Sequence, residues 1–422
     1  MSEDALILNL QEESLSMQQR KPFSSQTQLL YNSTLARDLI ELNAQDFLRD
    51  FERLCRMHIV RSSFSSNRGI RASNTVARQG AVASACRRQQ GPLGGASERR
   101  GRSLGTPLHC ASKAGHRDVA ACLLRVMDQA TPRSRNLTGA TALHEAVRHG
   151  HVEVVDLLMT TDPWLASVTT NGGVSPLYMA VSHSVQMVQA LLRPSQDGGP
   201  SPASAAGPEG CTALHVAAIK RTNEIAQEIL NWPEGPSLLT RADSSGRTPL
   251  HFAVIYGRLD TVKLFLGGDA ASPRLTSISD SDGSYPVHAA AMFGRTKIID
   301  ELVKKCPNYY ELVDDKGRNL LHIAVESEQE MVVRHICGND MFAMLLNATD
   351  YDGNTPLHLA VKQGYPRIFG LLLGTRGVDM CIMNKDGHTA RDISCCASTL
   401  EHGRLRYFLK HNPEKYREND KR

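Results

Sequence analysis

A four-residue phrase of the type Thr-Pro-Leu-His recurs eight times, and its period constrains the fold more than any other feature of the sequence. Successive copies are separated by 34 to 37 residues. A fixed period in this range indicates one supersecondary unit that is copied and stacked, each unit burying its apolar face against its neighbours. We therefore expect a solenoid with a long exposed surface. The copies begin at Thr106, Thr141, Ser175, Thr212, Thr248, Tyr285, Asn319 and Thr355.

Each copy carries the residue types that begin a short helix. A threonine or serine before proline is a favourable N-cap, because its hydroxyl accepts from a free backbone N–H and proline has no N–H to leave unpaired. The histidine is expected to form a hydrogen bond near the helix start that ties adjacent turns together. The positions given this structural role are Thr106, His109, Thr141, His144, Thr212, His215, Thr248, His251, His288, His322, Thr355 and His358.

Six residues after the histidine most copies carry glycine, which ends a helix because it tolerates a left-handed backbone. Ser184, Arg221 and Glu328 stand there in three copies, so those helices are expected to run on or to end differently. A second apolar helix follows, and an Asp-Gly turn leads to the next copy. Residues 193–209 are rich in Pro, Gly and Ser and predict a structureless loop, either a projecting binding loop or a neutral insertion.

The composition divides the chain into five segments. Residues 1–30 are rich in Ser and Gln and predict disorder, and 31–60 show leucines at helical spacing. Residues 61–104 hold nine arginines, no lysine and one acid, which predicts a flexible linker or, alternatively, a polyanion-binding or nuclear-targeting tract. The repeat array is expected over 105–393, with a ninth, degenerate copy at its end. A capping helix and a charged tail are expected over 394–422.

Bulk properties exclude several classes of protein. The net charge of +4 and the few aromatic residues argue against a nucleic-acid reader. Ten cysteines without a CxxC pair indicate a reducing compartment. Residues 1–20 do not resemble a secretory signal and the sequence shows no uninterrupted apolar run of 18 residues, so we expect a cytoplasmic protein without a membrane span. The adjacent Cys395 and Cys396 could accept a lipid, although unmodified thiols are the commoner outcome.

The repeated phrases resemble the ankyrin repeat, whose signature is a β-turn followed by two antiparallel helices, with T-P-L-H-x-A opening the first. The resemblance covers roughly 290 residues. It implies an all-α ankyrin-repeat solenoid of helix-turn-helix units with β-turn fingers, in which the first helices line a concave groove.

A closer resemblance is to plant ankyrin proteins of the accelerated-cell-death and Pro-Gly-Gly-domain type. It is carried by Gly283 to His288, Asp315 to His322, Asp352 to Ala360 and Asn384 to Ala390. Members of that family place a cytosolic array before a Pro-Gly-Gly segment and membrane helices, and act in defence, cell death and stress signalling. This sequence differs where the arginine tract replaces a repeat and where it ends at Arg422, before the expected membrane part.

The motifs that resemble metal-binding or catalytic sites coincide with ordinary positions of the repeat. His144 and His149 are five residues apart, so they leave the shared helix face that a zinc pair occupies. The His116-Arg117-Asp118 triplet resembles a kinase catalytic loop. It aligns, however, with the residues of the next copy that begin the second helix, so it belongs to the repeat. We therefore expect no catalytic residues, no metal site and no cofactor.

The leading hypothesis is a non-enzymatic scaffold that holds a protein partner in the groove and against the fingers. The alternative is a soluble short form of a plasma-membrane protein that acts with full-length membrane relatives, at the cytosolic face of that membrane. An enzyme or a nucleic-acid binder is the third and least favoured hypothesis. The candidate contact residues are at the turn tips, namely Asp243, Ser244, Ser245, Ser281, Asp282, Lys316, Tyr351 and Asp352.

Overall fold

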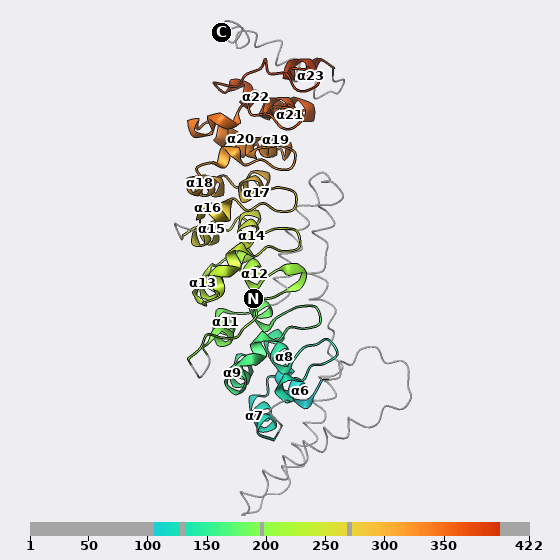
Figure 1. Cartoon of the computed structure of the whole chain (residues 1–422), viewed down its shortest axis with the longest axis vertical. Helices are drawn as coiled ribbons and strands as arrows, with labels where there is room; N and C mark the ends of the chain where they lie inside the picture. The colour runs from blue at the N-terminus through green and yellow to red at the C-terminus, as the bar shows by residue number, and fades with distance from the viewer. Residues whose placement is uncertain (1–104, 127–130, 195–197, 268–271, 397–422) are drawn as a thin grey trace, which may run out of the picture. The chain divides into compact units, whose positions relative to one another are not determined.

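The computed structural model describes residues 105–126, 131–194, 198–267 and 272–396 (Figure 1). All of them fall within one of the two units into which the chain divides, Val82–Arg422. The segments predicted over 1–30, 31–60 and 61–104, and the chain after residue 396, lie outside the described residues. The side chains of Cys395 and Cys396 do so too.

Eight helix pairs make up the array, and the described residues contain no β-strand, so the fold is an all-α solenoid. The first helices are α6 (Pro107–Lys113), α8 (Ala142–Arg148), α10 (Pro176–Ala180), α12 (Ala213–Ile219), α14 (Pro249–Ile255), α17 (Pro286–Met292), α19 (Leu320–Glu326) and α21 (Pro356–Gln363). The second helices are α7 (Arg117–Val126), α9 (Val152–Thr161), α11 (Val185–Leu192), α13 (Glu224–Asn231), α15 (Leu259–Phe265), α18 (Thr296–Lys305), α20 (Glu330–Cys337) and α22 (Pro366–Gly374).

Shorter elements join the pairs. The connecting helices are α16 (Ser272–Thr276) and the 3-10 turns η1 (Thr131–Arg133), η2 (Pro163–Ser167), η3 (Pro208–Gly210), η4 (Gly235–Thr240), η5 (Tyr309–Glu311) and η6 (Asp340–Leu345). Helix α23 (Ala390–Cys396) is the first helix of the ninth copy and packs on α21. We call the copies unit 1 to unit 9 in chain order.

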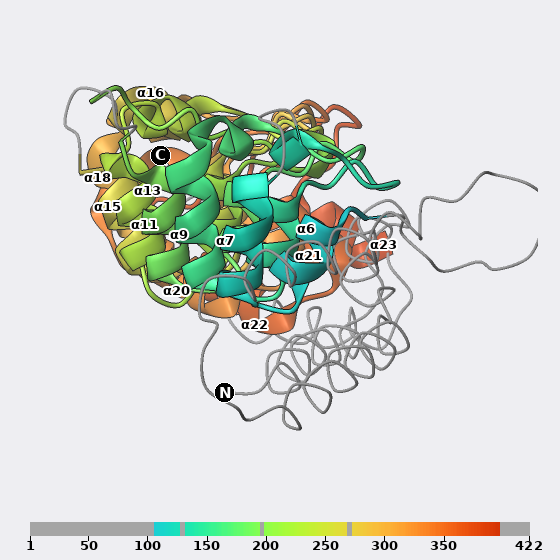
Figure 2. The ribbon, with the colours of Figure 1, turned by 90° about the horizontal axis from the view of Figure 1, so that it is seen from below.

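The core is shared between neighbouring units and does not lie inside any one of them. First helices pack on first helices and second helices on second helices along the stack, as in α12 on α14 and α11 on α13. The third residue of each phrase, leucine or valine, and the alanine two residues after the fourth are buried, for example Leu250 and Ala253 of α14. Figures 1 and 2 show the turns projecting on the side of the first helices, away from the second helices.

In the seven units that carry the repeat histidine, this histidine and the first residue of the phrase form a capping box. In α21 the imidazole Nδ1 of His358 accepts from the backbone N–H of Thr355 at 3.1 Å, and the Thr355 hydroxyl lies 2.8 Å from the same nitrogen. Because Nδ1 is an acceptor, Nε2 carries the proton and donates to a carbonyl of the following unit. The seven bonds run from His109 to Ala140, His144 to Val174, His215 to Arg247, His251 to Ser284, His288 to Leu312, His322 to Asn354 and His358 to His388.

Burial keeps these imidazoles neutral. Desolvation lowers the pKa of His144, His251, His288 and His322 to about 4. Desolvation also lowers the pKa of His109, His215 and His358. A proton on Nδ1 would remove the acceptor that holds the cap, so the hydrogen bonds at both ring nitrogens require the neutral form.

Each first helix ends at nearly the same register whether or not glycine follows it. Gly364 takes a left-handed backbone, with φ 76°, at the C-cap of α21. In unit 7 the same position is Glu328, which adopts φ 55° and accepts the strain of that region. In unit 3, Ser184 instead caps α11 by accepting from Met187 N–H at 3.2 Å. None of the three helices without the glycine runs on, because the next helix must turn back onto the core.

Side chains that follow the glycine position satisfy carbonyls of the preceding unit. His151 Nε2 donates to the Lys113 carbonyl, Arg258 Nε to Ile219 and Arg295 Nη2 to Ile255, over 2.6 to 3.2 Å. These carbonyls lie at the C-terminal ends of first helices, where no intrahelical donor is available and cations are favoured. The stack therefore gains a second row of bonds between units, which the sequence did not reveal.

Residues 201–206, in the segment between units 3 and 4, do not project, so the projecting-loop alternative is wrong for them. Ser201, Ala203 and Ala205 are buried and alternate with half-buried neighbours, as in an extended strand. Ser201 Oγ donates to the Leu191 carbonyl at 2.7 Å, and Ser204 N–H donates to the Ala166 carbonyl. The small side chains let this strap pack between the helices, a role that its Pro/Gly/Ser composition concealed.

Unit 3 carries tyrosine in place of the repeat histidine. The Tyr178 side chain is 8% exposed, and its hydroxyl has no hydrogen-bond partner among the described residues. Desolvation raises the pKa of this phenol. The ring occupies the space next to Gly207, where a Cβ would come within 2.2 Å of it. Tyr178 therefore fills the position of the histidine without forming its bond to the next unit.

We predict that the array loses stability as the pH falls from 7 toward 5. The repeat histidines have lowered pKa values in the folded state, so below pH 6.5 the unfolded chain takes up protons that the folded array does not. At pH 5.5 each of the four histidines with a pKa of about 4 removes about 1 kcal/mol of the stability present at neutral pH. Urea unfolding at a series of pH values measures the loss.

The His322→Leu variant is the matched test of this assignment. It should be less stable at pH 7, because the bonds to Asn319 and Asn354 are gone, yet its pH dependence should be shallower by about one proton. An unfolding free energy that stays flat between pH 7 and 5 would contradict the neutral, buried histidines.

We also predict opposite effects for two tyrosine-to-phenylalanine substitutions. Tyr178→Phe should raise the unfolding free energy by about 1 kcal/mol, because it removes a buried hydroxyl without a partner. Tyr309→Phe should lower it by about 1 kcal/mol, because the Tyr309 hydroxyl donates to the Met341 carbonyl. Urea denaturation measures the unfolding free energy of both variants. A lower unfolding free energy in both would show that the Tyr178 hydroxyl has a favourable role.

Candidate interaction surface

Six of the described fingers are each closed by one polar side chain at the base. The Oδ1 atom of this residue accepts from the backbone N–H groups two and four residues later, over 2.7 to 3.1 Å, which fixes the turn. The residues in this role are Asn136, Asp243, Asp280, Asp314, Asp350 and Asn384. In two fingers an arginine four residues on adds an ion pair to the carboxylate, Arg247 to Asp243 and Arg318 to Asp314.

The electrostatics of the finger base favour the charged carboxylate at Asp314. Burial works to raise the pKa of this carboxyl, but hydrogen bonds from the side chain and backbone of Arg318 and from Lys316 N–H outweigh it, and the pKa is lowered. The carboxylate is therefore part of the structure of the finger and is not available to a ligand.

Six pairs of neighbouring fingers are joined by backbone hydrogen bonds. In each case an N–H near one finger tip donates to a carbonyl near the preceding tip, with N···O distances of 2.7 to 3.5 Å. The pairs are Asn171 to Thr138, Ser244 to Glu209, Ser281 to Ser245, Asp315 to Asp282, Tyr351 to Lys316 and Lys385 to Asp352. The tips therefore form a fixed row with a spacing set by the stack, which holds their side chains in place before a partner arrives.

The structure places most of the proposed contact residues at these tips. Ser244, Ser281, Asp282, Lys316, Tyr351 and Asp352 are exposed, and Ser245 is half-buried. Tyr351 is 60% exposed, and its ring lies over Gly317, where a Cβ would come within 2.5 Å of the ring. Asp243 differs from the others: it is buried and held by Ser245 and Arg247, so it belongs to the base of the finger and we withdraw it as a contact residue.

The roles of the finger-base arginines and of Phe252 were not predicted from the sequence. The Phe252 ring packs edge-on against His215 of the preceding unit at 5.2 Å, and the Arg247 guanidinium lies 5.2 Å from its centre. This contact joins the finger of unit 5 to its first helix. The signal available in the sequence was the Asp-x-x-Gly-Arg spacing, which recurs nearly unchanged as Asp-Asp-Lys-Gly-Arg before unit 7.

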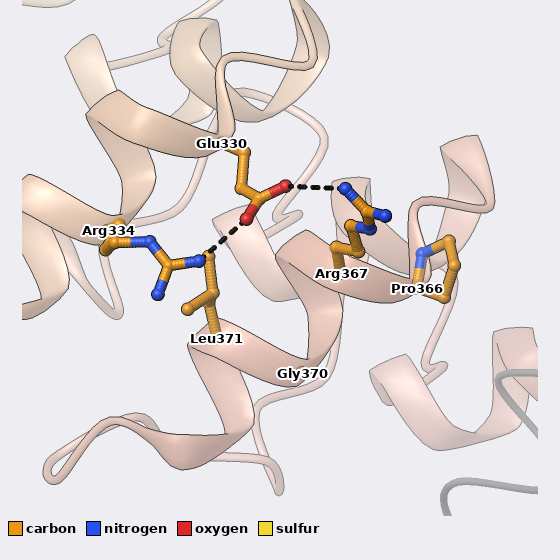
Figure 3. A pocket seen from close by; sticks show the side chains of 6 residues that line it. All are labelled: Glu330, Arg334, Pro366, Arg367, Gly370 and Leu371. Atoms are coloured by element: carbon orange, nitrogen blue, oxygen red, sulfur yellow. Dashed lines mark hydrogen bonds and ion pairs between the residues drawn. The ribbon is translucent and has the colours of Figure 1, made fainter.

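The outer side of the array carries a shallow depression between α20 and α22 (Figure 3). It has a volume of about 490 Å³ and is lined by Glu330, Arg334, Pro366, Arg367, Gly370 and Leu371. Glu330 pairs with Arg334 at 2.7 Å and with Arg367 at 3.7 Å, so its charged groups already have partners. Their arrangement links the second helices of units 7 and 8 and does not mark a binding site.

The part of the chain that the structure describes holds no cluster of three side chains suited to a metal ion. Within the same residues no helix is both long and apolar enough to cross a membrane.

Comparison with known families identifies the repeat. A family model described as ankyrin repeats (3 copies) matches residues 95–167, 177–277 and 269–343, and one described as ankyrin repeats (many copies) matches 342–394. Among solved structures, the ankyrin repeat domain of Bcl-3 aligns over 64% of this chain and 99% of its own, with 22% identity and a TM-score of 0.42. A superposition this loose carries no functional argument.

Three curated relatives are similar over part of their length. Protein ACCELERATED CELL DEATH 6 of Arabidopsis thaliana is 30% identical over 286 residues, which is 63% of this chain and 37% of that protein. The E3 ubiquitin-protein ligase XBAT33 of the same plant is 28% identical over 40% of this chain and 30% of its own. The probable ligase XBOS33 of Oryza sativa is 30% identical over 39% and 31%. The matches thus span about a third of these relatives.

Two neighbouring aspartates of one finger provide a matched prediction. Asp314→Ala should lower the unfolding free energy by about 2 to 3 kcal/mol, because it removes hydrogen bonds to a charged group and leaves Arg318 without this partner. Asp315→Ala, at the exposed tip, should change it by less than about 0.5 kcal/mol. Equal losses in a denaturation experiment would show that Asp314 does not hold the finger.

Proposed function

The chain belongs to the ankyrin-repeat family, and from this we propose that it is a scaffold without catalytic activity that binds a protein partner. The observation that supports it best is the row of exposed finger tips, which hydrogen bonds between units hold in a fixed geometry. Fixed tips lose little conformational freedom on binding, so most of the contact energy contributes to affinity. The tips differ between units in charge and size, which provides specificity along the row.

The contact residues of this proposal are Ser244, Ser245, Ser281, Asp282, Lys316, Tyr351 and Asp352. Tyr351 is the expected hot spot, because aromatic residues at interfaces bury a large apolar surface at little entropic cost. Asp282 and Asp352 would select a partner with complementary positive charge. The first helices, which lie beside the fingers, would contribute the second part of the interface.

The similarity to ACCELERATED CELL DEATH 6 supports a narrower proposal, a role in plant defence, cell-death or stress signalling. As an alternative within it, the chain would act with full-length membrane relatives at the cytosolic face of the plasma membrane. The names of XBAT33 and XBOS33 motivate a second candidate, recruitment of a substrate for ubiquitin transfer, in which an array of this kind would hold the substrate and another part of the protein would act on it.

We predict that the finger tips determine partner capture. The full chain, immobilised, should retain a reproducible partner from plant lysate, and the triple variant Asp282→Lys, Tyr351→Ser, Asp352→Lys should reduce its retention at least about tenfold. The outer-face variant Arg334→Ser is the matched control and should retain the partner. A partner that binds the triple variant as well as the unaltered chain would rule out the fingers as the contact surface.

A further inference from the structure

The first helices of units 4 to 6 end in side chains of an unusual kind. The last residue of each helix and the residue after it are Ile219 and Lys220, Ile255 and Tyr256, and Met292 and Phe293. We call these six residues the central row. All six are half-buried, and α12 packs on α14 as α14 packs on α17, so the row is continuous across three units.

The same two positions in other units show that packing does not require such residues. Unit 3 has Ser182 and His183 there, both exposed, and unit 8 has Lys362 and Gln363, also exposed. Ile255 and Met292 of the central row pack against the core, but Ile219 and Phe293 are not among the described residues that do, so core packing accounts for only part of the row. Apolar side chains left partly in water on a surface of this kind are typical of an interface.

Lys220 lies at one end of this row, and its ammonium group has no ion-pair partner among the described residues. Burial alone lowers the pKa of its ammonium group. No ion pair or hydrogen bond joins that group to another residue in the described part of the chain. A half-buried charge without a counter-charge is unfavourable in the free protein, and an anion placed against it would remove that cost.

The neighbouring charges are mainly positive. Arg221 follows Lys220 and is exposed, and Arg258 and Arg295 donate to the carbonyls of Ile219 and Ile255, which places their guanidinium groups at the edge of the row. The acidic residues of the helices that follow are Glu224 and Asp260, in the first turns of α13 and α15. Of these six charged residues next to the apolar strip, four are cationic and two are acidic.

We propose that the central row binds a partner segment in which acidic residues flank an aromatic or aliphatic side chain. The apolar residue would lie on Ile255, Tyr256, Met292 and Phe293, and the acidic residue would meet Lys220. This inference rests on the proposed scaffold function and specifies the chemistry of the bound segment. Neighbouring first helices are about 8 to 10 Å apart, so a segment crossing three of them spans about 20 Å, the length of six or seven extended residues.

A random 12-residue peptide library displayed on phage tests this directly. Selection on the full chain, with counter-selection on the Lys220→Glu, Phe293→Ser double variant, should enrich peptides that carry Asp or Glu near Leu, Ile or Phe. A fluorescent copy of an enriched peptide should bind the unaltered chain about tenfold more tightly than it binds Lys220→Met, which keeps the length and apolar stem of the side chain. Circular dichroism establishes that each variant is folded.

The control is Lys304→Met on α18, where the lysine pairs with Glu301 on the outer side. This variant should bind the enriched peptide as tightly as the unaltered chain does. Enriched peptides without an excess of acidic residues, or equal affinity for Lys220→Met, would overturn the proposal. Tighter binding of a fluorescent dT12 oligonucleotide than of any enriched peptide would also overturn it, since a phosphate chain needs the cations but not the apolar strip.

The two proposals fail in different ways. If the lysate partner is lost from the finger variant while the library shows no acidic preference, the central-row inference is refuted and the scaffold function stands. If the library selects acidic peptides that depend on Lys220, while the finger variant retains the lysate partner as well as the unaltered chain does, the central-row inference is supported. The finger tips are then refuted as the contact surface.

Discussion

The structure depends on the fact that no helix pair buries its own apolar surface. Leu250 and Ala253 are fully covered only because the first helices of the flanking units pack on α14. A stack built this way gains stability from nearest-neighbour contacts, and each contact must be specific enough to hold the register. The repeat histidines supply that specificity, because each neutral imidazole bonds its own helix cap through Nδ1 and the next unit through Nε2.

These bonds between units have a functional consequence. A turn held only by its own residues would move, whereas a finger whose backbone bonds to the finger before it can move only with its neighbours. The Tyr351 N–H bond to the Lys316 carbonyl is one such link. The buried carboxylates at the finger bases also restrict movement of the fingers, since Asp243 and Asp314 organise the turn and leave its tip exposed. The surface that a partner would meet is therefore largely formed in advance.

Most of the fold could be predicted from the sequence, because the repeat period and the Thr-Pro-Leu-His phrase determine the helix pairs and their order. The errors have physical reasons. Asp243 looked like a tip residue because aspartate is usually exposed in turns, but here its carboxylate accepts backbone N–H groups and pairs with Arg247. The strap with Ser201, Ala203 and Ala205 looked structureless, since its small residues show their alternation only once they are packed. The bonds of Arg258 and Arg295 to earlier carbonyls depend on long-range geometry that local pattern does not contain.

Amide hydrogen exchange of the His322→Ala variant tests the dependence between units most directly. The variant loses the bond to the Asn354 carbonyl at the finger of unit 8. We predict faster exchange in units 7 and 8 together, including the Tyr351 N–H at the tip of the next finger, with unchanged exchange at the Asn171 N–H in unit 3. Faster exchange confined to the cap of α19, with the finger of unit 8 as protected as before, would contradict it.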